Sequence, residues 1–194
     1  MTEQRTRPTR IRVSGLQETQ LHALVEVEEA AAALYVESGF AEGEVPARRL
    51  TDIVALTRDH NVLVAEADHV VAGYAAWRDE APGVGVIGTI AVHPDFQRVG
   101  VGSKLVATIE EEARDAGLKH LVIRCRTKAP WAMEFCRRLG FSAIGADAPG
   151  KVAKWGEDRA ATGLREDEAV LWAPVREAPE PPADEDELSD AAES

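Results

Sequence analysis

The amino-acid sequence predicts a single α/β domain, with a mixed central sheet of about six to seven strands flanked by helices. Two observations carry this prediction. Residues of the AVILMFWYC set make up 45% of the 194 residues, which is enough to form a hydrophobic core. Segments with the two-residue period of strands also alternate along the chain with segments that have the 3.6-residue period of helices.

The expected strands are short apolar or alternating segments bounded by turn residues. They lie at residues 10–13, 61–66, 70–78, 84–92, 121–125, 141–144 and 169–172. The second and third are separated by only three residues, so we expect them to form an antiparallel pair. The fourth follows an Ala-Pro-Gly break and is almost entirely apolar.

The expected helices carry apolar side chains at spacings of three and four residues. They lie at residues 18–38, 46–57, 102–116, 130–139 and 152–161. Gly39 and Gly140 follow the first and fourth helices, where glycine commonly ends a helix. Pro46 is expected in the first turn of the second helix, because proline is tolerated there.

The charge and composition of the chain argue against several classes of function. The net charge is −12 and the isoelectric point is about 4.9, so nucleic acid is not expected as the main partner, because phosphate binding needs a basic surface. No apolar run approaches the roughly 20 residues of a membrane span, and no secretory signal is recognisable at the N-terminus. Two cysteines are too few for a disulfide framework, and the histidines show no metal-ligand spacing with them. A cytoplasmic, metal-free protein is expected.

The acidic residues are unevenly distributed. Residues 177–194 hold eight acidic residues and no basic one, in a segment rich in Pro and Ala, and we expect a disordered tail there. Residues 1–9 are expected to be a flexible N-terminal segment, which leaves residues 10–176 as the folded domain. The part of the chain between residues 13 and 176 then has a charge of about −7.

One motif stands out at the junction of an apolar strand and an amphipathic helix. Residues 97–102 read Q-R-V-G-V-G and follow V-H-P at residues 92–94. Two glycines at the start of a helix allow a ligand to approach free backbone N–H groups, which is a site for phosphate. The stretch fits neither the Walker pattern G-x-x-x-x-G-K-[ST] nor the Rossmann pattern G-x-G-x-x-G.

The motif matches in full the Q/R-x-x-G-x-G/A loop of the GCN5-related N-acetyltransferase (GNAT) superfamily, and a second stretch agrees with it. Residues 132–141, A-M-E-F-C-R-R-L-G-F, resemble the A-x-x-L-Y-x-K-x-G-F pattern that family members carry on a later helix. The resemblance covers roughly residues 10–175. It implies the GNAT fold and an acetyl-CoA-dependent N-acyltransferase that uses no metal.

The resemblance implies a cofactor site made mostly of backbone. The strand residues Ile90, Ala91 and Val92 are expected to pair with the pantetheine arm of acetyl-CoA. The pyrophosphate is expected on the loop, formed by Gln97, Arg98, Val99, Gly100, Val101, Gly102 and Ser103.

The catalytic residues depart from the family pattern. Cys136 stands where the family has the tyrosine that protonates the leaving thiolate, and it is either a replacement acid or an inert core thiol. Thr89 stands where many relatives have a carboxylate base, and it could hold a water molecule. Glu28 falls on the apolar stripe of the first helix, so it is either a base or anchor for the amine or one half of a structural ion pair. Tyr35, Phe40 and Trp77 are expected as aromatic walls of the acceptor pocket.

The predicted acceptor is the amine of a small metabolite or antibiotic-like molecule, attacking the thioester directly. The alternatives are an inactive CoA-binding or regulatory module, and an acyltransferase that acts on a protein amine or uses a carrier-protein thioester. Members of the family often form homodimers, so a homodimer is also considered.

Overall fold

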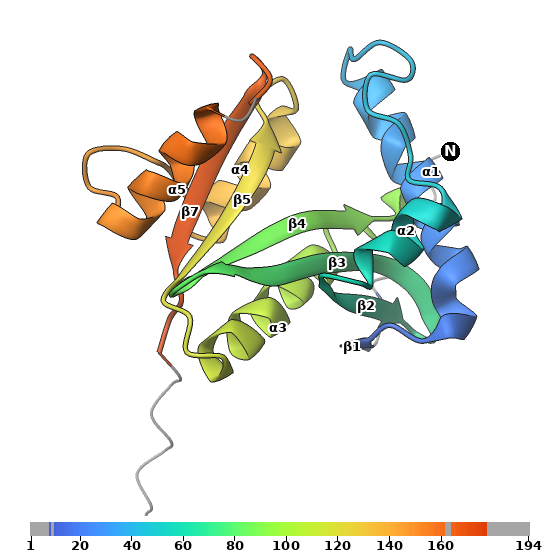
Figure 1. Ribbon diagram of the computed structural model, residues 1–194. Coiled ribbons are helices and arrows are strands. Elements are labelled where there is room, and N and C mark those ends of the chain that lie inside the picture. Colours follow the sequence, from blue (N-terminus) through green and yellow to red (C-terminus); the bar gives the residue numbers. More distant parts are fainter. Residues whose placement is uncertain (1–7, 9, 162–163, 178–194) are drawn as a thin grey trace, which may run out of the picture.

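The computed structural model describes residue 8, residues 10–161 and residues 164–177, and these form one seven-stranded sheet with helices on both faces (Figure 1). The strand order is β1-β2-β3-β4-β5-β7-β6, and only the β4–β5 pair is parallel. The predicted mixed α/β fold is therefore confirmed. The predicted acidic tail lies outside the described residues from position 178 on, as does nearly all of the predicted N-terminal segment.

The strands are β1 (Ile11–Gly15), β2 (Asn61–Ala67), β3 (Val70–Ala81), β4 (Val84–Val92), β5 (His120–Arg126), β6 (Ser142–Ala143) and β7 (Glu168–Pro174). The helices are α1 (Leu21–Glu37), α2 (Leu50–Leu56), α3 (Val101–Asp115), α4 (Pro130–Arg138) and α5 (Gly150–Ala161), with single 3₁₀ turns η1 (Glu18–Gln20) and η2 (Pro94–Phe96). The expected β2–β3 pair is antiparallel and is joined by Asp68 and His69, both with positive φ, as a tight hairpin turn requires.

The start of α2 differs from the prediction. The helix begins at Leu50, four residues after Pro46, because the preceding backbone has other hydrogen-bond partners. The N–H of Arg48 donates to the Glu28 carboxylate at 3.0 Å, and the N–H of Arg49 donates to the Asp52 carboxylate at 3.0 Å. Arg49 is thereby the N-cap, and residues 46–48 stay outside the helix.

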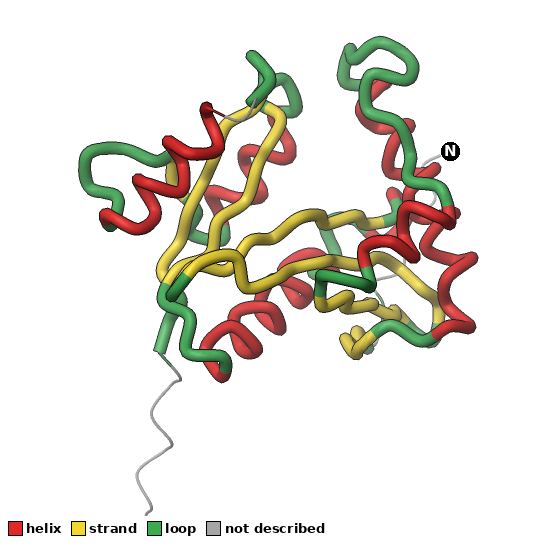
Figure 2. Tube along the Cα trace, in the orientation of Figure 1, coloured by secondary structure: helices red, strands yellow, loops and turns green. Residues whose placement is uncertain are grey.

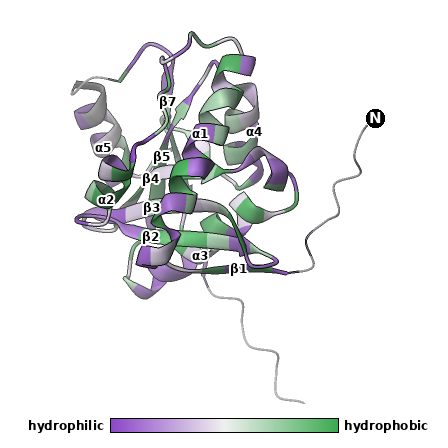
Figure 3. Ribbon diagram, turned by 90° about the vertical axis from the view of Figure 1, so that its right-hand side faces the viewer, coloured by the Kyte–Doolittle hydropathy of each residue, from purple (hydrophilic) through white to green (hydrophobic). Residues whose placement is uncertain are grey.

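The helices cover the sheet on two sides. α3 and α4 pack on one face, where Leu105 and Ile109 meet strand residues such as Ile87 in the larger apolar cluster. α1 and α2 cover the other face through a cluster that includes Leu24 and Ile53. α5 packs against β5 and β7 through a third cluster, and Figure 3 shows α4 and α5 flanking this half of the sheet.

The sheet opens between β4 and β5. The two strands pair only from Val84 to Ile87, and β5 then turns away from β4 (Figure 1 and Figure 2). A bulge at Gly88, where no β3 residue stands opposite, marks the point of divergence. A Cβ atom at Gly88 would lie 3.0 Å from the His60 ring, so a larger residue there would require the ring to shift. Beyond the bulge, β4 pairs with β3 alone among the described strands, which leaves one backbone edge free.

Candidate functional site

The predicted phosphate loop connects β4 to α3. The chain leaves β4 at Val92, forms η2, and turns through residues 97–100 into the helix. Arg98 and Gly100 have φ values of +60° and +104°, and Gly100 is the N-cap of α3. The first N–H groups of an α-helix have no acceptor within the helix and lie at the positive end of its dipole. This turn therefore presents backbone donors that suit an anion.

Packing against α4 supports this loop. A Cβ atom on Gly102 would lie 3.0 Å from two ring carbons of Phe135, so the ring lies directly against the first turn of α3. The Gln97 side chain turns toward β4, with Nε2 at 3.5 Å from the Val92 carbonyl oxygen. All the predicted loop residues thus lie on one continuous turn beside the end of β4.

The free edge of β4 leads into this loop. The N–H of His93 donates to the Ala72 carbonyl of β3 at 2.9 Å. Because alternate residues of a strand direct their backbone groups to opposite sides, the N–H groups of Ile90 and Val92 face the opened side. The free strand edge and the helix N-terminus form one track of backbone hydrogen-bonding groups.

On the α1 face, four side chains from four parts of the chain form a network that is buried at Glu28 and Tyr74 and partly exposed at Arg48 and Thr89. Glu28 is 6% exposed, and its Oε1 accepts hydrogen bonds from the Tyr74 hydroxyl at 2.5 Å and from Arg48 Nη1 at 3.1 Å. Its Oε2 accepts from the Arg48 N–H at 3.0 Å, and Arg48 Nη1 also donates to Thr89 Oγ1 at 3.0 Å. Burial, followed by the Glu28 charge, raises the pKa of Tyr74, so its hydroxyl stays protonated. Burial alone would lower the pKa of Arg48, but Tyr74 and Glu28 beside it raise it overall.

Two predicted residues belong to this network. Glu28 is buried as predicted and forms an ion pair with Arg48, so the carboxylate already accepts three hydrogen bonds. Thr89 Oγ1 accepts a hydrogen bond from Arg48, a partner that the sequence did not suggest. The side chain that joins the two is Arg48, which sequence reasoning missed because no local pattern marks it.

An aromatic cluster lies where the ends of α1 and β5 face each other. The Tyr35 ring is 5.3 Å from Phe40 and 5.1 Å from Trp131, both in edge-to-face contact. The Trp131 indole N–H donates to Ser38 Oγ at 3.1 Å. Tyr35 and Phe40 thus lie against each other, and Trp131 joins them from the first turn of α4. That Tyr35 and Phe40 form walls of the acceptor pocket stays a prediction.

Trp77 lies elsewhere, and its expected place beside Tyr35 and Phe40 was wrong. Its side chain is 3% exposed in the core on the α3 face, and its indole N–H donates to Glu112 at 2.8 Å. The bulge in the β3–β4 pairing lies between Ala76 and Trp77. On β3 itself, Tyr74 and Ala76 face α1 while Trp77 faces α3, because successive side chains of a strand alternate.

Arg126, at the end of β5, closes the other side of the opening. Its guanidinium is 13% exposed and pairs with Glu44 at 3.0 Å and with Asp167 at 2.7 Å. It also lies over the Phe40 ring at 5.2 Å from the centroid. These contacts tie β5 to the segment between α1 and α2 and to the residues that precede β7.

The Tyr35 phenol connects the two sides. Burial raises its pKa, and the charges that act on it come from Cys125 and Arg126 of the β5 side and from Glu28 and Arg48 of the α1 side. Charged side chains from both arms of the opening therefore act on one phenol. We call the set Glu28, Tyr35, Arg48, Thr89 and Arg126 the acceptor wall, after the role that is proposed for it below.

Cys136 lies in the core of the α4 face. It is 3% exposed and packs in the same apolar cluster as Cys125, whose thiol is also buried. The neighbouring Cys125 thiol and burial raise the pKa of Cys136. A thiol with a raised pKa transfers its proton less readily, so this environment favours packing over acid catalysis.

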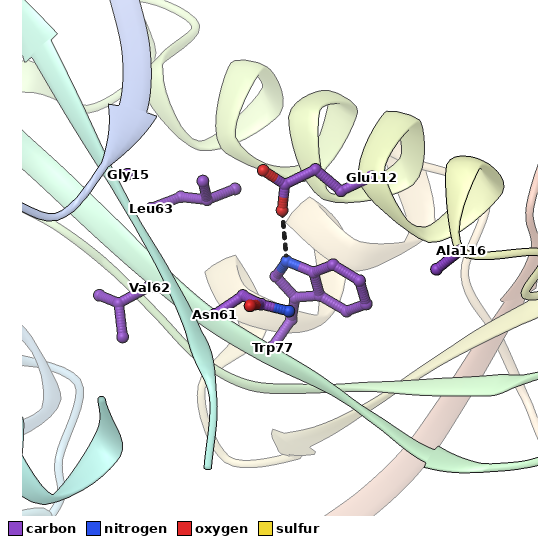
Figure 4. A pocket seen from close by; sticks show the side chains of 7 residues that line it. All are labelled: Gly15, Asn61, Val62, Leu63, Trp77, Glu112 and Ala116. Atoms are coloured by element: carbon purple, nitrogen blue, oxygen red, sulfur yellow. Dashed lines mark hydrogen bonds between the residues drawn. The ribbon is translucent and has the colours of Figure 1, made fainter. Parts of the chain in front are cut away.

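A shallow hollow lies away from this site (Figure 4). Its volume is about 360 Å³, and Trp77 and Glu112 meet in it beside Asn61 and Ala116. Ala116 follows the C-terminal end of α3, whereas the phosphate loop lies at the N-terminal end. Among the described residues no group of three or more His, Cys, Asp or Glu side chains could hold a metal ion, and no described helix has the length and apolar character of a membrane span.

Comparison with known proteins places this geometry among acyltransferases. The model of the acetyltransferase (GNAT) family matches residues 25–141. The L-amino acid N-acyltransferase MnaT of Escherichia coli (strain K12) is 34% identical over 99 residues, which are 49% of this chain and 57% of that protein. The chain therefore spans little more than half the length of this relative.

Solved structures share the fold at low sequence identity. The PaiA N-acetyltransferase of Thermoplasma acidophilum, in complex with coenzyme A, has a TM-score of 0.69 at 14% identity, covering 86% of this chain and 99% of that one. The ribosomal-protein-S18-alanine N-acetyltransferase of Escherichia coli has a TM-score of 0.63 at 19% identity, covering 88% and 97%. YncA of Salmonella typhimurium, a putative acetyltransferase with its cofactor acetyl-CoA, has a TM-score of 0.62 at 18% identity, covering 90% and 99%.

Proposed function

The chain belongs to the acetyltransferase (GNAT) family, and from this we propose that it transfers an acyl group from an acyl-CoA to the amine of a small metabolite. The observation that carries the proposal is the free β4 edge that leads into the Gly100 turn. A flexible chain that ends in a pyrophosphate has the shape and hydrogen-bonding groups to follow this track.

The residues present suit coenzyme A. We assign the pyrophosphate to the N–H groups of Val101, Gly102 and Ser103, and the amide groups of the pantetheine arm to the β4 edge at Val92. This site uses backbone dipoles, so it does not require a positive net charge. Two structural neighbours, PaiA and YncA, hold coenzyme A and acetyl-CoA respectively, which supports the assignment.

The chemistry needs a neutral amine and a stabilised oxyanion. An alkylammonium must first lose a proton, because the lone pair attacks the thioester carbon. The tetrahedral intermediate then carries a negative oxygen, and the N–H of Ile90, on the free edge of β4, is placed to donate to it. Collapse breaks the C–S bond, and the departing thiolate takes up a proton to give free CoA.

The two predicted catalytic side chains fit this scheme less well. Glu28 already accepts three hydrogen bonds and pairs with Arg48, which favours the structural ion pair over the base. Cys136 is buried beside Cys125, which favours the core thiol over the acid.

The acceptor is proposed to be a small molecule. The relative MnaT is named as an L-amino acid N-acyltransferase, which makes free amino acids the first class to test. Glu44 and Asp167 add negative charge beside Arg126 at the rim of the opening, which favours an acceptor that arrives as an ammonium ion.

One assay tests this function. The purified chain is mixed with acetyl-CoA and a panel of amino acids, other small amines and short peptides, and the release of free CoA thiol is followed. We expect turnover with small amines. Tight CoA binding without turnover on any amine would indicate a regulatory module instead, and turnover only with peptides would indicate a protein acyltransferase. Comparing acetyl-CoA with an acyl-carrier-protein thioester tests the donor. The homodimer and the cytoplasmic location remain predictions.

A further inference from the structure

Arg48 is the one member of the acceptor wall that combines a fixed position with an exposed charge. It follows α1 in the chain and precedes α2, and its side chain is 36% exposed. Nη1 is held at 3.1 Å from Glu28 and at 3.0 Å from Thr89. The guanidinium group is thereby anchored on its buried side, at a strand residue next to Ile90.

The outer edge of this guanidinium remains for a ligand. A guanidinium carries five N–H donors. In Arg48, the hydrogen bonds to Glu28 and to Thr89 are both donated by Nη1. Nε and Nη2 form the edge that binds a carboxylate through two parallel hydrogen bonds. Because Glu28 and Thr89 hold the other end, little side-chain entropy is lost when a ligand binds.

Arg126 provides an internal contrast. Arg126 lies over the Phe40 ring, which contacts Tyr35, whereas Arg48 is bonded to Glu28 of the helix that carries Tyr35. The charges of both arginines act on the pKa of the Tyr35 phenol, so we place both at the same opening. Arg126, however, is only 13% exposed and is already paired with Glu44 and Asp167. Of these two cations, only Arg48 has an exposed edge for an anion.

We propose that Arg48 binds the carboxylate of the acceptor, so that the acceptor is an α-amino acid whose amine is presented to β4. This inference rests on the proposed function. The carboxylate and the amine of an α-amino acid are attached to the same carbon atom, so a carboxylate at Arg48 keeps the amine beside Thr89 and the adjacent β4 edge. Trp131, which is 40% exposed and contacts Tyr35, offers an aromatic surface to the side chain of the amino acid.

The test compares acceptors that differ only in the carboxylate. L-leucine, L-leucinamide and 3-methylbutylamine are assayed with acetyl-CoA, followed by the phenylalanine series, and the rates are expressed per unbound, unprotonated amine because the amine pKa values differ. We expect kcat/KM for the amino acid to exceed that for the other two by about 30-fold, as for hydrogen bonds to a charged group. In Arg48→Met this preference falls below about threefold, mainly through the KM of the amino acid.

Two further variants control for folding. Arg49→Met removes the neighbouring arginine, which is exposed and paired with Asp52, and it should keep the full preference. Arg48→Lys keeps the positive charge beside Glu28 but lacks the planar fork, so it should fold and still lose most of the preference. The KM for acetyl-CoA should change less than twofold in all three variants.

The possible results separate this inference from the proposed function. Equal rates with L-leucine, L-leucinamide and 3-methylbutylamine, or an unchanged preference in Arg48→Met and Arg48→Lys, would overturn the role of Arg48 while leaving the acyltransferase intact. Absence of turnover on every amine would overturn the proposed function. In that event, calorimetric titration of L-leucine into the CoA-bound protein still tests whether Arg48 binds the carboxylate. Binding heat with the wild type and none with Arg48→Met would support this role of Arg48. Absence of binding heat with both proteins would overturn it.

Discussion

The phosphate loop and the acceptor wall meet at the opening of the sheet but are built in opposite ways. The loop is a continuous stretch of residues 92–103 and presents backbone N–H groups. The acceptor wall consists of side chains from α1, β4, β5 and the segment before α2, and Glu28 and Thr89 each reach Arg48 across many residues of chain. The loop is therefore encoded by local sequence, whereas the acceptor wall is assembled only by the fold.

The two regions also use charge differently. The proposed phosphate site relies on the dipole of α3, and so it is compatible with a chain whose net charge is −12. The acceptor wall places Arg48 and Arg126 beside carboxylates, so its charges are largely compensated. Substitutions in the loop should therefore weaken the binding of acyl-CoA. Substitutions in the acceptor wall should instead weaken the binding of the acceptor and lower the free energy of unfolding.

The largest effect is expected from Gly102→Val. The new Cβ would lie 3.0 Å from the Phe135 ring, and the added methyl groups would crowd the N–H groups of the first turn. We expect kcat/KM for acetyl-CoA to fall about 100-fold, corresponding to a loss of roughly 3 kcal/mol of binding, with a smaller loss of about 1–3 kcal/mol in unfolding free energy.

Steady-state kinetics and urea unfolding measure these two quantities. Gly150→Val is the matched control, because a Cβ there meets no atom within 4 Å and the backbone φ is not positive. Unchanged acetyl-CoA kinetics in Gly102→Val would contradict a cofactor site on this turn.

The next effect is expected from Glu28→Gln in the acceptor wall. The substitution leaves the Arg48 charge without its carboxylate, and because Arg48 is partly exposed we expect a loss of about 1–3 kcal/mol in unfolding free energy, below the range for fully buried pairs. The KM for the acceptor should rise about tenfold while the KM for acetyl-CoA stays constant.

Glu29→Gln, at the exposed neighbouring position, is the control for Glu28→Gln. A fall in kcat alone, with the loss of a basic limb from the pH–rate profile and normal stability, would instead identify Glu28 as the base.

A smaller effect is expected from Cys136→Ala, at the buried position of α4. Removing the buried sulfur should cost about 1–2 kcal/mol of unfolding free energy, because a small cavity forms. Turnover should stay within about threefold of the wild type, as in Cys125→Ala, when kcat is measured across pH 6–9. A drop in kcat above about 30-fold that Cys136→Ser partly restores would assign the acid role to Cys136.

The smallest effect is expected from Glu110→Gln in the helix that carries the phosphate loop. The Glu110 carboxylate accepts hydrogen bonds from the Arg176 N–H at 2.7 Å and from Nε at 2.8 Å. The hydrogen bond from the Arg176 side chain lowers the pKa of Glu110. The pair therefore stabilises the fold above the unfolded-state pKa of about 4.3, and this stability disappears as the pH falls through the lower folded-state value.

Urea unfolding at pH 7, 5 and 3 measures the difference between the wild type and Glu110→Gln. Because the Arg176 side chain is 68% exposed, we expect less than about 1 kcal/mol at pH 7 and a smaller difference at pH 3. Glu111→Gln, at an exposed position on the same helix, should show no such pH dependence. Both variants should keep full activity.

Most of the element order was predictable because its signals are local. The alternation in β2 and β3, the amphipathic pattern of α3 and the glycines after α1 and α4 each act within a few residues. The start of α2 was not predictable in this way. Pro46 favours a helix start locally, but the Arg48 backbone N–H donates to Glu28, twenty residues earlier in the chain.

By itself, then, the sequence determined the fold class and the turn that carries the proposed phosphate site, because Gly100 and Gly102 act through the backbone of their own turn. Only the tertiary structure decided which side chains form the acceptor wall. It placed Trp77 in the core and Trp131 beside Tyr35, and it joined Glu28, Arg48 and Thr89 in one network. The physical reason is that the face on which a strand residue lies, and the partner of a buried charge, depend on bulges and on contacts between segments that are distant in sequence.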